Sequence, residues 1–380
     1  MSGDRLAVGL IGCGKIAVNY HVPAYLALAE RCRVVAVADP TPSRRDLAAA
    51  ELGLSGEALF VDALELLDSV PVDVVDVCTP QHLRKEIVLA ALERGIHVLS
   101  EKPLASIPAD AAELVDAARS SGVHLGIVHN YLFWPEVEST VRRVAAGDIG
   151  AVRVAIVNFL GVPDLPGVAA WQPRWRHDPS AAGGGVLMDM LHAVYVAEAL
   201  LDTTFDGVSA FVTAHTPGSQ VEEVALCRYE AARAAALVNV GWGHGPGGLT
   251  VVGDEGRIEV RYADGGTPPF APLETVRVHT GRGSRTIEIP ESPGGIPAAI
   301  GDFVDAVGRA RPPRATGEDG VRALEATVAA YAAAARGRTV ALPLDRGSPV
   351  FRRGVAGLGE LVGHQGARPA LRGLFGLDAG

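Results

Sequence analysis

The feature of this sequence that most constrains its fold is a glycine-rich stretch directly after an apolar run. Residues 6–11 (LAVGLI) have the composition of a buried strand, and residues 12–17 (GCGKIA) follow without a break. In a G-x-G-x-x-A pattern the first glycine permits a tight turn, the second lets the backbone approach a pyrophosphate, and the small last residue lets a helix pack on the strand. The pattern therefore predicts a strand, a phosphate-binding turn and a helix, as at the start of a dinucleotide-binding domain.

An acidic residue at the expected distance supports this interpretation. Asp39 closes the second predicted strand, about 20 residues beyond the glycine turn, where a carboxylate accepts hydrogen bonds from the adenosine ribose and repels a 2′-phosphate. The position favours NAD, while Arg44 and Arg45 just beyond it leave NADP possible. The alternative, a strand, turn and helix that bind nothing, is less favoured because the three features occur together.

The first third of the chain alternates short β-rich runs with helical stretches, which is the pattern of a parallel sheet covered on both faces. Strands are expected at 6–11, 33–38, 72–78, 96–99 and 123–128, and helices from the glycine turn to about residue 30 and at 41–52, 83–94 and 108–120. We therefore expect an α/β N-terminal Rossmann domain with a doubly wound parallel sheet over residues 1–128.

The pattern changes in the second part of the chain, where longer alternating segments follow one another without a helix between each pair. Such segments occupy 152–159, 225–240 and 257–260, and helices are expected at 187–201, 298–309 and 320–335. This predicts an α+β C-terminal domain with a mostly antiparallel sheet over residues 129–349. The Gly- and Arg-rich tail, 350–380, is either a strapping segment or partly disordered.

Composition excludes several classes of protein. The net charge is −10 without a basic cluster, which argues against nucleic acid as a partner. The chain contains no apolar run of about 18 residues and no basic leader before an apolar segment, so we expect a cytoplasmic protein without a membrane span. The four cysteines are scattered without the spacing of a disulfide framework or zinc site, so we expect buried thiols and no metal.

Lysine is rare in this chain, in which nearly all basic residues are arginine. The three lysines are Lys15, Lys85 and Lys102, and Lys102 lies in the sequence Glu101-Lys102-Pro103 just after the predicted strand 96–99. In open α/β sheets the carboxyl end of a strand is where ligands bind. A proline restricts the preceding residue to extended conformations and permits a cis bond, so the ammonium can be aimed at a ligand. An ordinary surface turn is the competing interpretation.

A second group of polar residues follows three glycines, 183–185, and lies within an apolar stretch. Asp189 and His192 are three residues apart, so they share one face of the predicted helix, and Tyr195 continues that face one turn later. A carboxylate beside an imidazole orients the ring and stabilises its protonated form, which tunes a general base. A helix cap followed by a buried structural histidine is the alternative.

As an ordered set these motifs resemble the Gfo/Idh/MocA family of sugar and cyclitol dehydrogenases. The resemblance extends to about residue 345 and is carried by residues 12–17, 79–80, 101–105, 147–150, 175–185, 252–256, 316–319 and 342–343, with Asp189, His192 and Phe303. It is specific for family and not for substrate. It implies a second domain with a large open antiparallel sheet that usually makes dimer or tetramer contacts, so a homodimer or homotetramer is expected.

The resemblance also implies the residues of the site. Lys102, Asp189 and His192 surround the reacting carbon, and the expected cofactor contacts are Gly12, Gly14, Lys15, Ile16, Asp39, Thr79, Pro80, His82, Glu101 and Lys102. Family members usually have the histidine four residues after the aspartate, whereas the gap here is three, which makes Tyr195 a candidate substitute for His192. A second departure is Arg84, where members often have a histidine.

The resulting hypothesis is hydride transfer between NAD(P) and a secondary alcohol or ketone of a sugar, polyol or cyclitol. His192 accepts the hydroxyl proton, Lys102 donates hydrogen bonds to the oxygen, and Asp189 fixes His192. The expected substrate contacts are Asn130, Trp175, Arg176, Tyr195 and His244. Three alternatives stay open: a ketosugar reductase of secondary-metabolite or nucleotide-sugar biosynthesis, a redox-neutral glycoside-modifying enzyme with tightly bound NAD, and a catalytically silent NAD-binding protein.

Overall fold

The computed structural model describes residues 5–164, 174–363, 371 and 373–377. The chain divides into two compact units. The N-terminal unit comprises Met1–Ser106, Asp110–Phe133 and Pro293–Val321, and the C-terminal unit comprises Ile107–Ala109, Trp134–Ser292 and Arg322–Gly380.

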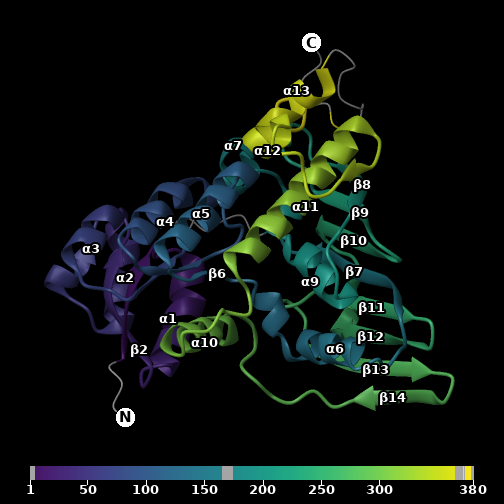
Figure 1. Ribbon diagram of the computed structural model, residues 1–380, viewed down its shortest axis with the longest axis horizontal. Helices are drawn as coiled ribbons and strands as arrows, with labels where there is room; N and C mark the ends of the chain where they lie inside the picture. The colour runs from purple at the N-terminus through teal and green to yellow at the C-terminus, as the bar shows by residue number, and fades with distance from the viewer. Residues whose placement is uncertain (1–4, 165–173, 364–370, 372, 378–380) are drawn as a thin grey trace. The chain divides into compact units, whose positions relative to one another are not determined.

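The N-terminal unit is built on a parallel six-stranded sheet in the order β3-β2-β1-β4-β5-β6. The central strands β1 (Leu6–Ile11) and β4 (Val74–Val77) are almost wholly apolar and buried, as expected where helices cover both faces. The flanking strands are β2 (Cys32–Ala38), β3 (Leu59–Phe60), β5 (His97–Ser100) and β6 (Leu125–Ile127). This order is that of a dinucleotide-binding fold, so the predicted Rossmann class is confirmed (Figure 1).

Most predicted elements of this unit are present with small shifts at their ends. The helices are α1 (Val22–Ala27), α2 (Pro42–Leu52), α3 (Ala63–Ser69), α4 (Arg84–Glu93), α5 (Pro108–Ser121) and α10 (Gly295–Gly308). Sequence reasoning missed β3 and α3, of which β3, with two residues, is too short to show periodicity. The helix expected after the glycine turn begins instead as a π-helix, Ala17–His21, and α1 ends three residues before the predicted end.

The segment 293–321 belongs to the N-terminal unit, although the prediction placed it in the second domain. The Ile127 amide donates to the Ala315 carbonyl at 3.1 Å, and Arg31 pairs with Asp305 of α10 at 2.6 Å. These contacts join residues that are far apart in the sequence, which is why periodicity alone could not assign the segment.

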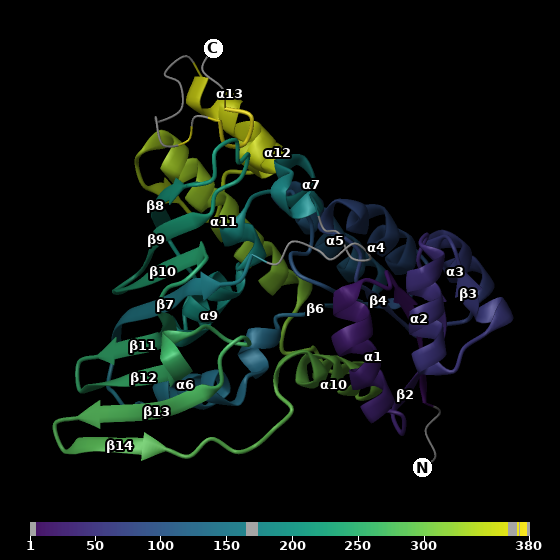
Figure 2. The ribbon, with the colours of Figure 1, turned by 180° about the vertical axis from the view of Figure 1, so that it is seen from behind.

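The C-terminal unit is built on a nine-stranded sheet in the order β14-β13-β12-β11-β7-β10-β9-β8-β15. Every pair is antiparallel except β7 with β10, so the predicted mostly antiparallel sheet is confirmed (Figure 2). The strands are β7 (Val152–Val162), β8 (Gly207–Thr213), β9 (Val224–Ala231), β10 (Ala234–Trp242), β11 (Gly247–Gly253), β12 (Gly256–Tyr262), β13 (Leu273–Thr280), β14 (Gly283–Ile287) and β15 (Val340–Ala341). One alternating segment predicted at 225–240 is in fact the hairpin β9-β10, which turns at Ala232 with φ of 42°.

Helices pack on this sheet and form the rest of the unit. They are α6 (Pro135–Ala145), α7 (Pro179–Ala182), α8 (Val186–Asp189), α9 (His192–Leu201), α12 (Pro349–Arg353), α13 (Leu358–Val362) and most of α11 (Gly317–Arg336). Helix α9 lies against β7 and β10, where Val157, Phe159 and Val238 are completely buried. The described part of the tail packs on this unit, since the Phe375 and Tyr331 rings lie 5.0 Å apart between centroids.

The single helix predicted at 187–201 is wrong. Met190 and Leu191 interrupt it, so that α8 and α9 are separate helices, and the chain Pro179–Asp189 meets His192–Leu201 at 45°. This bent pair passes the length and composition test for a broken membrane span. Among the described residues no single helix is long and apolar enough to cross a membrane.

Candidate active site

The glycine turn of the N-terminal unit is shaped as a ligand cradle. Gly12 has φ of +90°, and a Cβ there would lie 2.9 Å from the backbone of Cys78 and Thr79, so only glycine fits. A Cβ on Gly14 would meet no atom within 4 Å, which leaves its backbone open to the approach of a ligand. Both glycines therefore have the environment that the sequence motif requires for a pyrophosphate.

Asp39 joins this turn to the end of β2. Its carboxylate accepts hydrogen bonds from the amides of Cys13 and Thr41, both at 2.8 Å, and Arg45 donates to its carbonyl at 2.8 Å. Each carboxylate oxygen can accept a second bond, so the group retains capacity for ribose hydroxyls. The acid predicted from spacing is thus placed beside the glycine turn.

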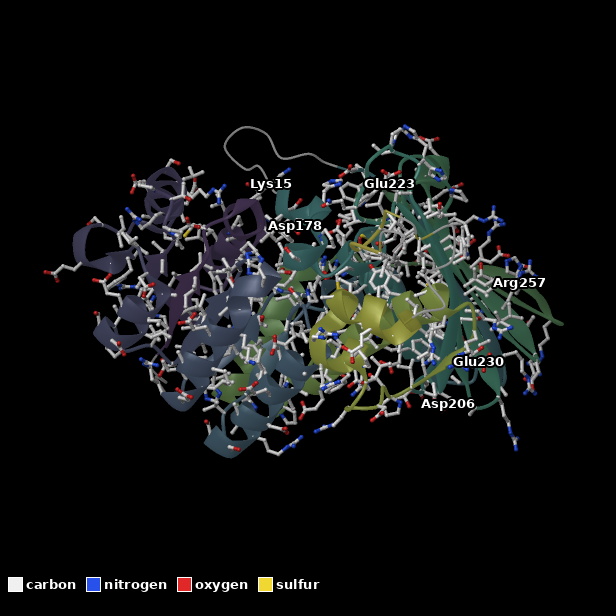
Figure 3. All side chains as sticks on the ribbon, turned by 90° about the horizontal axis from the view of Figure 1, so that it is seen from above. Lys15, Asp178, Asp206, Glu223, Glu230 and Arg257 are labelled. Carbon is white, nitrogen blue, oxygen red and sulfur yellow. The ribbon has the colours of Figure 1, made fainter. Side chains whose placement is uncertain are left out.

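The other expected cofactor residues surround the same strand ends. Thr79 and Pro80 follow β4, and the Thr79 hydroxyl is buried with no hydrogen-bond partner among the described residues. Lys15 and His82 are exposed, and Lys15 is labelled in Figure 3. A buried polar atom without a partner in such a place fits a ligand that supplies the missing bond.

Lys102 lies in a network of charged residues that we call the lysine cluster: His21, Asp76, Arg84, Glu101 and Lys102. Glu101 is 6% exposed, and one of its oxygens accepts the Lys102 amide at 3.0 Å while the other faces His21 Nε2 at 3.1 Å. The second nitrogen of His21, Nδ1, lies 2.7 Å from Asp76 Oδ2. Arg84 donates from Nε to the Thr79 carbonyl at 2.9 Å and from Nη1 to the Pro103 carbonyl, and the Lys102–Pro103 bond is cis.

Burial and charge set the protonation of this cluster. Burial would lower the pKa of His21, but the Asp76 carboxylate and the neighbouring Cys78 together hold that pKa well above its usual value. Burial would raise the pKa of Glu101, whereas His21, Lys102 and Arg84 hold it below its usual value. Burial lowers the pKa of Arg84 to about 10, which leaves it charged at neutral pH.

One side-chain ligand atom from each of His21, Asp76 and Cys78 lies within 4.8 Å of the others, a spacing that suits a metal ion. Burial raises the pKa of the Cys78 thiol to about 12, so it is not a thiolate at neutral pH. Because His21 and Asp76 also lie at direct hydrogen-bond distance, the three side chains have the geometry of a hydrogen-bond network.

A buried clamp explains two of the three glycines at 183–185, Gly184 and Gly185. Glu222 accepts the amides of Gly185 and Leu187 at 2.8 Å, and the Tyr331 hydroxyl donates to it at 2.7 Å. A Cβ on Gly184 would collide with Tyr331, and one on Gly185 with Glu222, so no side chain fits at either position. Burial raises the pKa of Glu222 to about 7 despite these hydrogen bonds.

We call four residues of the C-terminal unit the histidine cluster: Arg176 of a short 3-10 helix, Asp189 of α8, and His192 and Tyr195 of α9. His192 Nδ1 lies 2.5 Å from the Tyr195 hydroxyl, and Arg176 Nη1 lies 3.6 Å from Asp189 Oδ2. The argument that Asp189 and His192 share one helical face is wrong, because the chain breaks between them. His192 is 6% exposed and Tyr195 is 3% exposed, so the contact between them is shielded from water.

The expected substrate residues are distributed over several elements. Trp175 and Arg176 lie in a short 3-10 helix, where the guanidinium is 5.9 Å from the Trp175 ring. His244 is exposed just after β10. Asn130 begins a 3-10 turn of the N-terminal unit. Of this set, Arg176 contacts Asp189 and Tyr195 contacts His192 within the C-terminal unit.

Sequence reasoning missed His21, Asp76, Glu222 and Tyr331. Their partners are 35 or more residues away, so no local spacing links them. The only usable signal was polar side chains inside apolar segments, such as Asp76 within VVDV.

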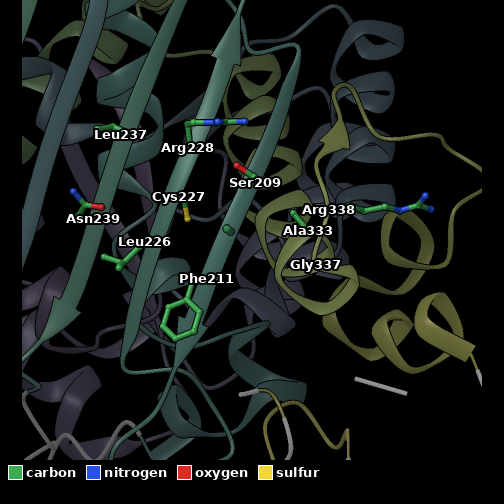
Figure 4. A pocket seen from close by; sticks show the side chains of 11 residues that line it. Ser209, Phe211, Leu226, Cys227, Arg228, Leu237, Asn239, Ala333, Gly337 and Arg338 are labelled. Carbon is green, nitrogen blue, oxygen red and sulfur yellow. The ribbon is translucent and has the colours of Figure 1, made fainter. Parts of the chain in front are cut away.

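A shallow pocket of about 390 Å³ lies on the C-terminal unit, and its lining includes no residue of the histidine cluster. It is lined by residues of β8, β9, β10 and the end of α11: Ser209, Ala210, Phe211, Leu226, Cys227, Arg228, Leu237, Asn239, Ala333, Gly337 and Arg338 (Figure 4). Phe211, Leu226 and Leu237 are 47%, 42% and 37% exposed, which makes this an apolar surface of the sheet.

Comparison with known proteins identifies both units. Residues 6–129 match the Gfo/Idh/MocA model described as an oxidoreductase family with an NAD-binding Rossmann fold, and residues 141–342 match its C-terminal alpha/beta domain. A levoglucosan dehydrogenase of Pseudarthrobacter phenanthrenivorans is 30% identical over 305 residues, which is 77% of this chain and 73% of that protein. A 1,5-anhydro-D-fructose reductase of Ensifer adhaerens is 31% identical over 348 residues, which is 87% of this chain and 96% of that protein.

A solved structure shows the same fold. Levoglucosan dehydrogenase, crystallised with NADH and levoglucosan, aligns with a TM-score of 0.78 at 23% identity, over 90% of this chain and 100% of that chain. The relatives are thus dehydrogenases and reductases of sugars.

Proposed function

Since the chain belongs to the Gfo/Idh/MocA oxidoreductase family, we propose that it is an NAD-dependent dehydrogenase of a sugar, polyol or cyclitol secondary alcohol. The lysine cluster carries this proposal. It supplies the ammonium of Lys102, a residue whose backbone is fixed at the carboxyl end of β5. The same unit contains the glycine turn and Asp39, which suit a dinucleotide. Such an edge is where ligands of open parallel sheets bind.

The residues proposed to hold the cofactor are those of the strand ends. Gly12, Gly14, Lys15 and Ile16 would face the pyrophosphate, Asp39 the adenosine ribose, and Thr79, Pro80, His82 and Glu101 the remaining part. A carboxylate at position 39 favours NAD over NADP by charge repulsion. When bound, the nicotinamide accepts the hydride that leaves the substrate carbon.

We assign the proton chemistry to the chain's own side chains. Lys102 donates hydrogen bonds to the substrate oxygen and stabilises its developing negative charge. His192 accepts the hydroxyl proton, and Tyr195 orients its ring through the 2.5 Å contact to Nδ1. Asp189, which pairs with Arg176, is assigned to a neighbouring substrate hydroxyl in place of the predicted direct hold on His192. Asn130, Trp175, Arg176 and His244 are proposed substrate contacts.

The reverse direction is the second candidate. One relative, covered over 96% of its length, is a 1,5-anhydro-D-fructose reductase, so the same residues could donate a proton as a ketone is reduced. The direction depends on the substrate and on the equilibrium, because the proton-handling groups are the same for both.

A panel assay tests the proposal. NAD and NADP are offered with levoglucosan, myo-inositol and other polyols, and NADH with 1,5-anhydro-D-fructose, while absorbance in the NADH band is followed. We expect NAD-linked turnover of at least one compound. Absorbance in that band in the protein as purified would favour the redox-neutral alternative, and NADH binding without turnover of any compound would favour a silent binding protein.

We also propose that the chain forms a homodimer or homotetramer through the apolar sheet surface of Phe211, Leu226 and Leu237. Exposed apolar patches of this kind mark interaction sites. Leu237→Lys should reduce the mass measured by light scattering to that of a smaller assembly, whereas Leu47→Lys, on the exposed side of α2, should not. An unchanged mass for Leu237→Lys would contradict this assignment.

A cytoplasmic location is also proposed. All four cysteines are buried free thiols, which suits a reducing compartment.

A further inference from the structure

The lysine cluster contains a histidine with no assigned role. His21 is completely buried at the end of the π-helix that follows the glycine turn. Its two nitrogens face carboxylates from two neighbouring strand ends: Asp76 of β4 at 2.7 Å and Glu101 after β5 at 3.1 Å. A single-turn π-helix in a helical segment often marks a functional site.

The two contacts define the charge of the ring. A neutral imidazole has one donor and one acceptor nitrogen, so it would direct a lone pair at one of the carboxylates. An imidazolium donates at both nitrogens and satisfies both acids. Buried charges are tolerated when they are paired and hydrogen-bonded in this way.

Other ionisable groups near the ring leave this assignment unchanged. The Cys78 thiol lies 3.3 Å from His21 Nδ1 and stays protonated, since burial raises its pKa to about 12. Burial also keeps Tyr25, beside Asp76, neutral by raising its pKa well above the usual value. Arg84 and Lys102 act on Glu101 and hold it ionised.

A hydrogen bond connects His21 and its two carboxylate partners to the backbone of Lys102. The Glu101 oxygen that does not face His21 accepts the Lys102 amide at 3.0 Å. Arg84, 4% exposed, ties the following Pro103 carbonyl to the Thr79 carbonyl. The backbone on both sides of Lys102 is therefore held by buried charged side chains.

We propose that His21 is a positioning residue, which as an imidazolium between Asp76 and Glu101 fixes the Glu101-Lys102-Pro103 turn and thereby aims the Lys102 ammonium at the substrate oxygen. The inference rests on the proposed function of Lys102. It adds a charged residue that touches neither substrate nor cofactor.

The first arm of the test is independent of activity. Ring-nitrogen NMR shifts of histidine-labelled protein are recorded at about pH 9, where an ordinary histidine is neutral. We expect one buried ring with both nitrogens protonated and in slow exchange with solvent. A spectrum in which no ring is doubly protonated overturns the inference, whether or not any variant folds.

The second arm compares His21→Gln with His97→Gln, a control histidine at the start of β5, the end of that strand remote from Glu101. Glutamine keeps a polar side chain but cannot donate to both acids or carry charge. We expect kcat to fall by about 10- to 100-fold in His21→Gln while NADH affinity stays near wild type, because small displacements of a reactive group cost this much. His97→Gln should match wild type in both.

The remaining outcomes overturn the inference. Wild-type kcat in a folded His21→Gln protein shows that the turn does not need the ring, and equal losses of kcat and NADH affinity show a merely structural role. The proposed function fails separately, if replacement of Lys102 leaves turnover intact. In that case the NMR result still decides the charge of His21.

Discussion

The two clusters hold their reactive groups by different means. In the lysine cluster the backbone of Lys102 depends on buried charges from three other elements, His21, Asp76 and Arg84. In the histidine cluster the ring of His192 contacts the Tyr195 hydroxyl, while the start of α8 is held by Glu222, which accepts the backbone amides of Gly185 and Leu187. The position of Lys102 is therefore sensitive to the loss of a buried charge. The position of His192 is sensitive to the loss of the Glu222 cap or of the Tyr195 hydroxyl.

The largest expected effect lies in the histidine cluster. His192→Ala should lower kcat by about 10²- to 10⁴-fold, the usual contribution of a general base, with NADH affinity unchanged because the cofactor motif is in the other unit. Steady-state kinetics and NADH fluorescence titration measure the two quantities, with the exposed His215→Ala as control. A loss below tenfold would transfer the role of base to Tyr195, the substitute suggested by the shortened spacing.

The next prediction concerns the pH dependence of stability. The folded pKa of Glu222 is about 7 against an ordinary value of 4.5, so between these values the folded state binds more protons than the unfolded state. The free energy of unfolding should therefore fall as pH rises through this window, by about 3 kcal/mol. Urea unfolding at several pH values should show this slope in wild type and in Glu230→Gln, a control at a half-exposed residue of β9, and a flatter slope in Glu222→Gln.

A slope in Glu222→Gln equal to that of wild type would mean that the clamp does not titrate. The C-terminal unit would then have no pH-sensitive contribution from Glu222, although Glu222 would still cap the start of α8.

The smallest effect is expected for Tyr195→Phe. The change removes the hydroxyl from His192 Nδ1 but keeps the ring, whose centroid lies 5.5 Å from the imidazole. We expect kcat to fall about tenfold, the equivalent of one hydrogen bond to an ionisable group. The exposed Tyr20→Phe serves as control, and an unchanged kcat would show that His192 is oriented by other contacts.

The dinucleotide-binding turn could be predicted from the sequence, because its motif is local. Gly12, Gly14 and Asp39 act through chain neighbours and adjacent strands, so spacing alone placed them correctly beside one another. The broken helix at Asp189 was not readable, because the clamp that shapes its start comes from Glu222 and Tyr331, 35 or more residues away. The role of His21 was hidden for the same reason, since its acids belong to β4 and to the end of β5.

The most direct test of the central claim compares two of the three lysines. Lys102→Met keeps the apolar stem and removes the ammonium, and Lys85→Met does the same to a lysine that pairs on the surface with Asp110 and Glu113. With the best substrate of the panel, the account predicts that kcat falls about 10²- to 10³-fold in Lys102→Met, with NADH affinity retained, and stays at wild type in Lys85→Met. Wild-type turnover in Lys102→Met would contradict it.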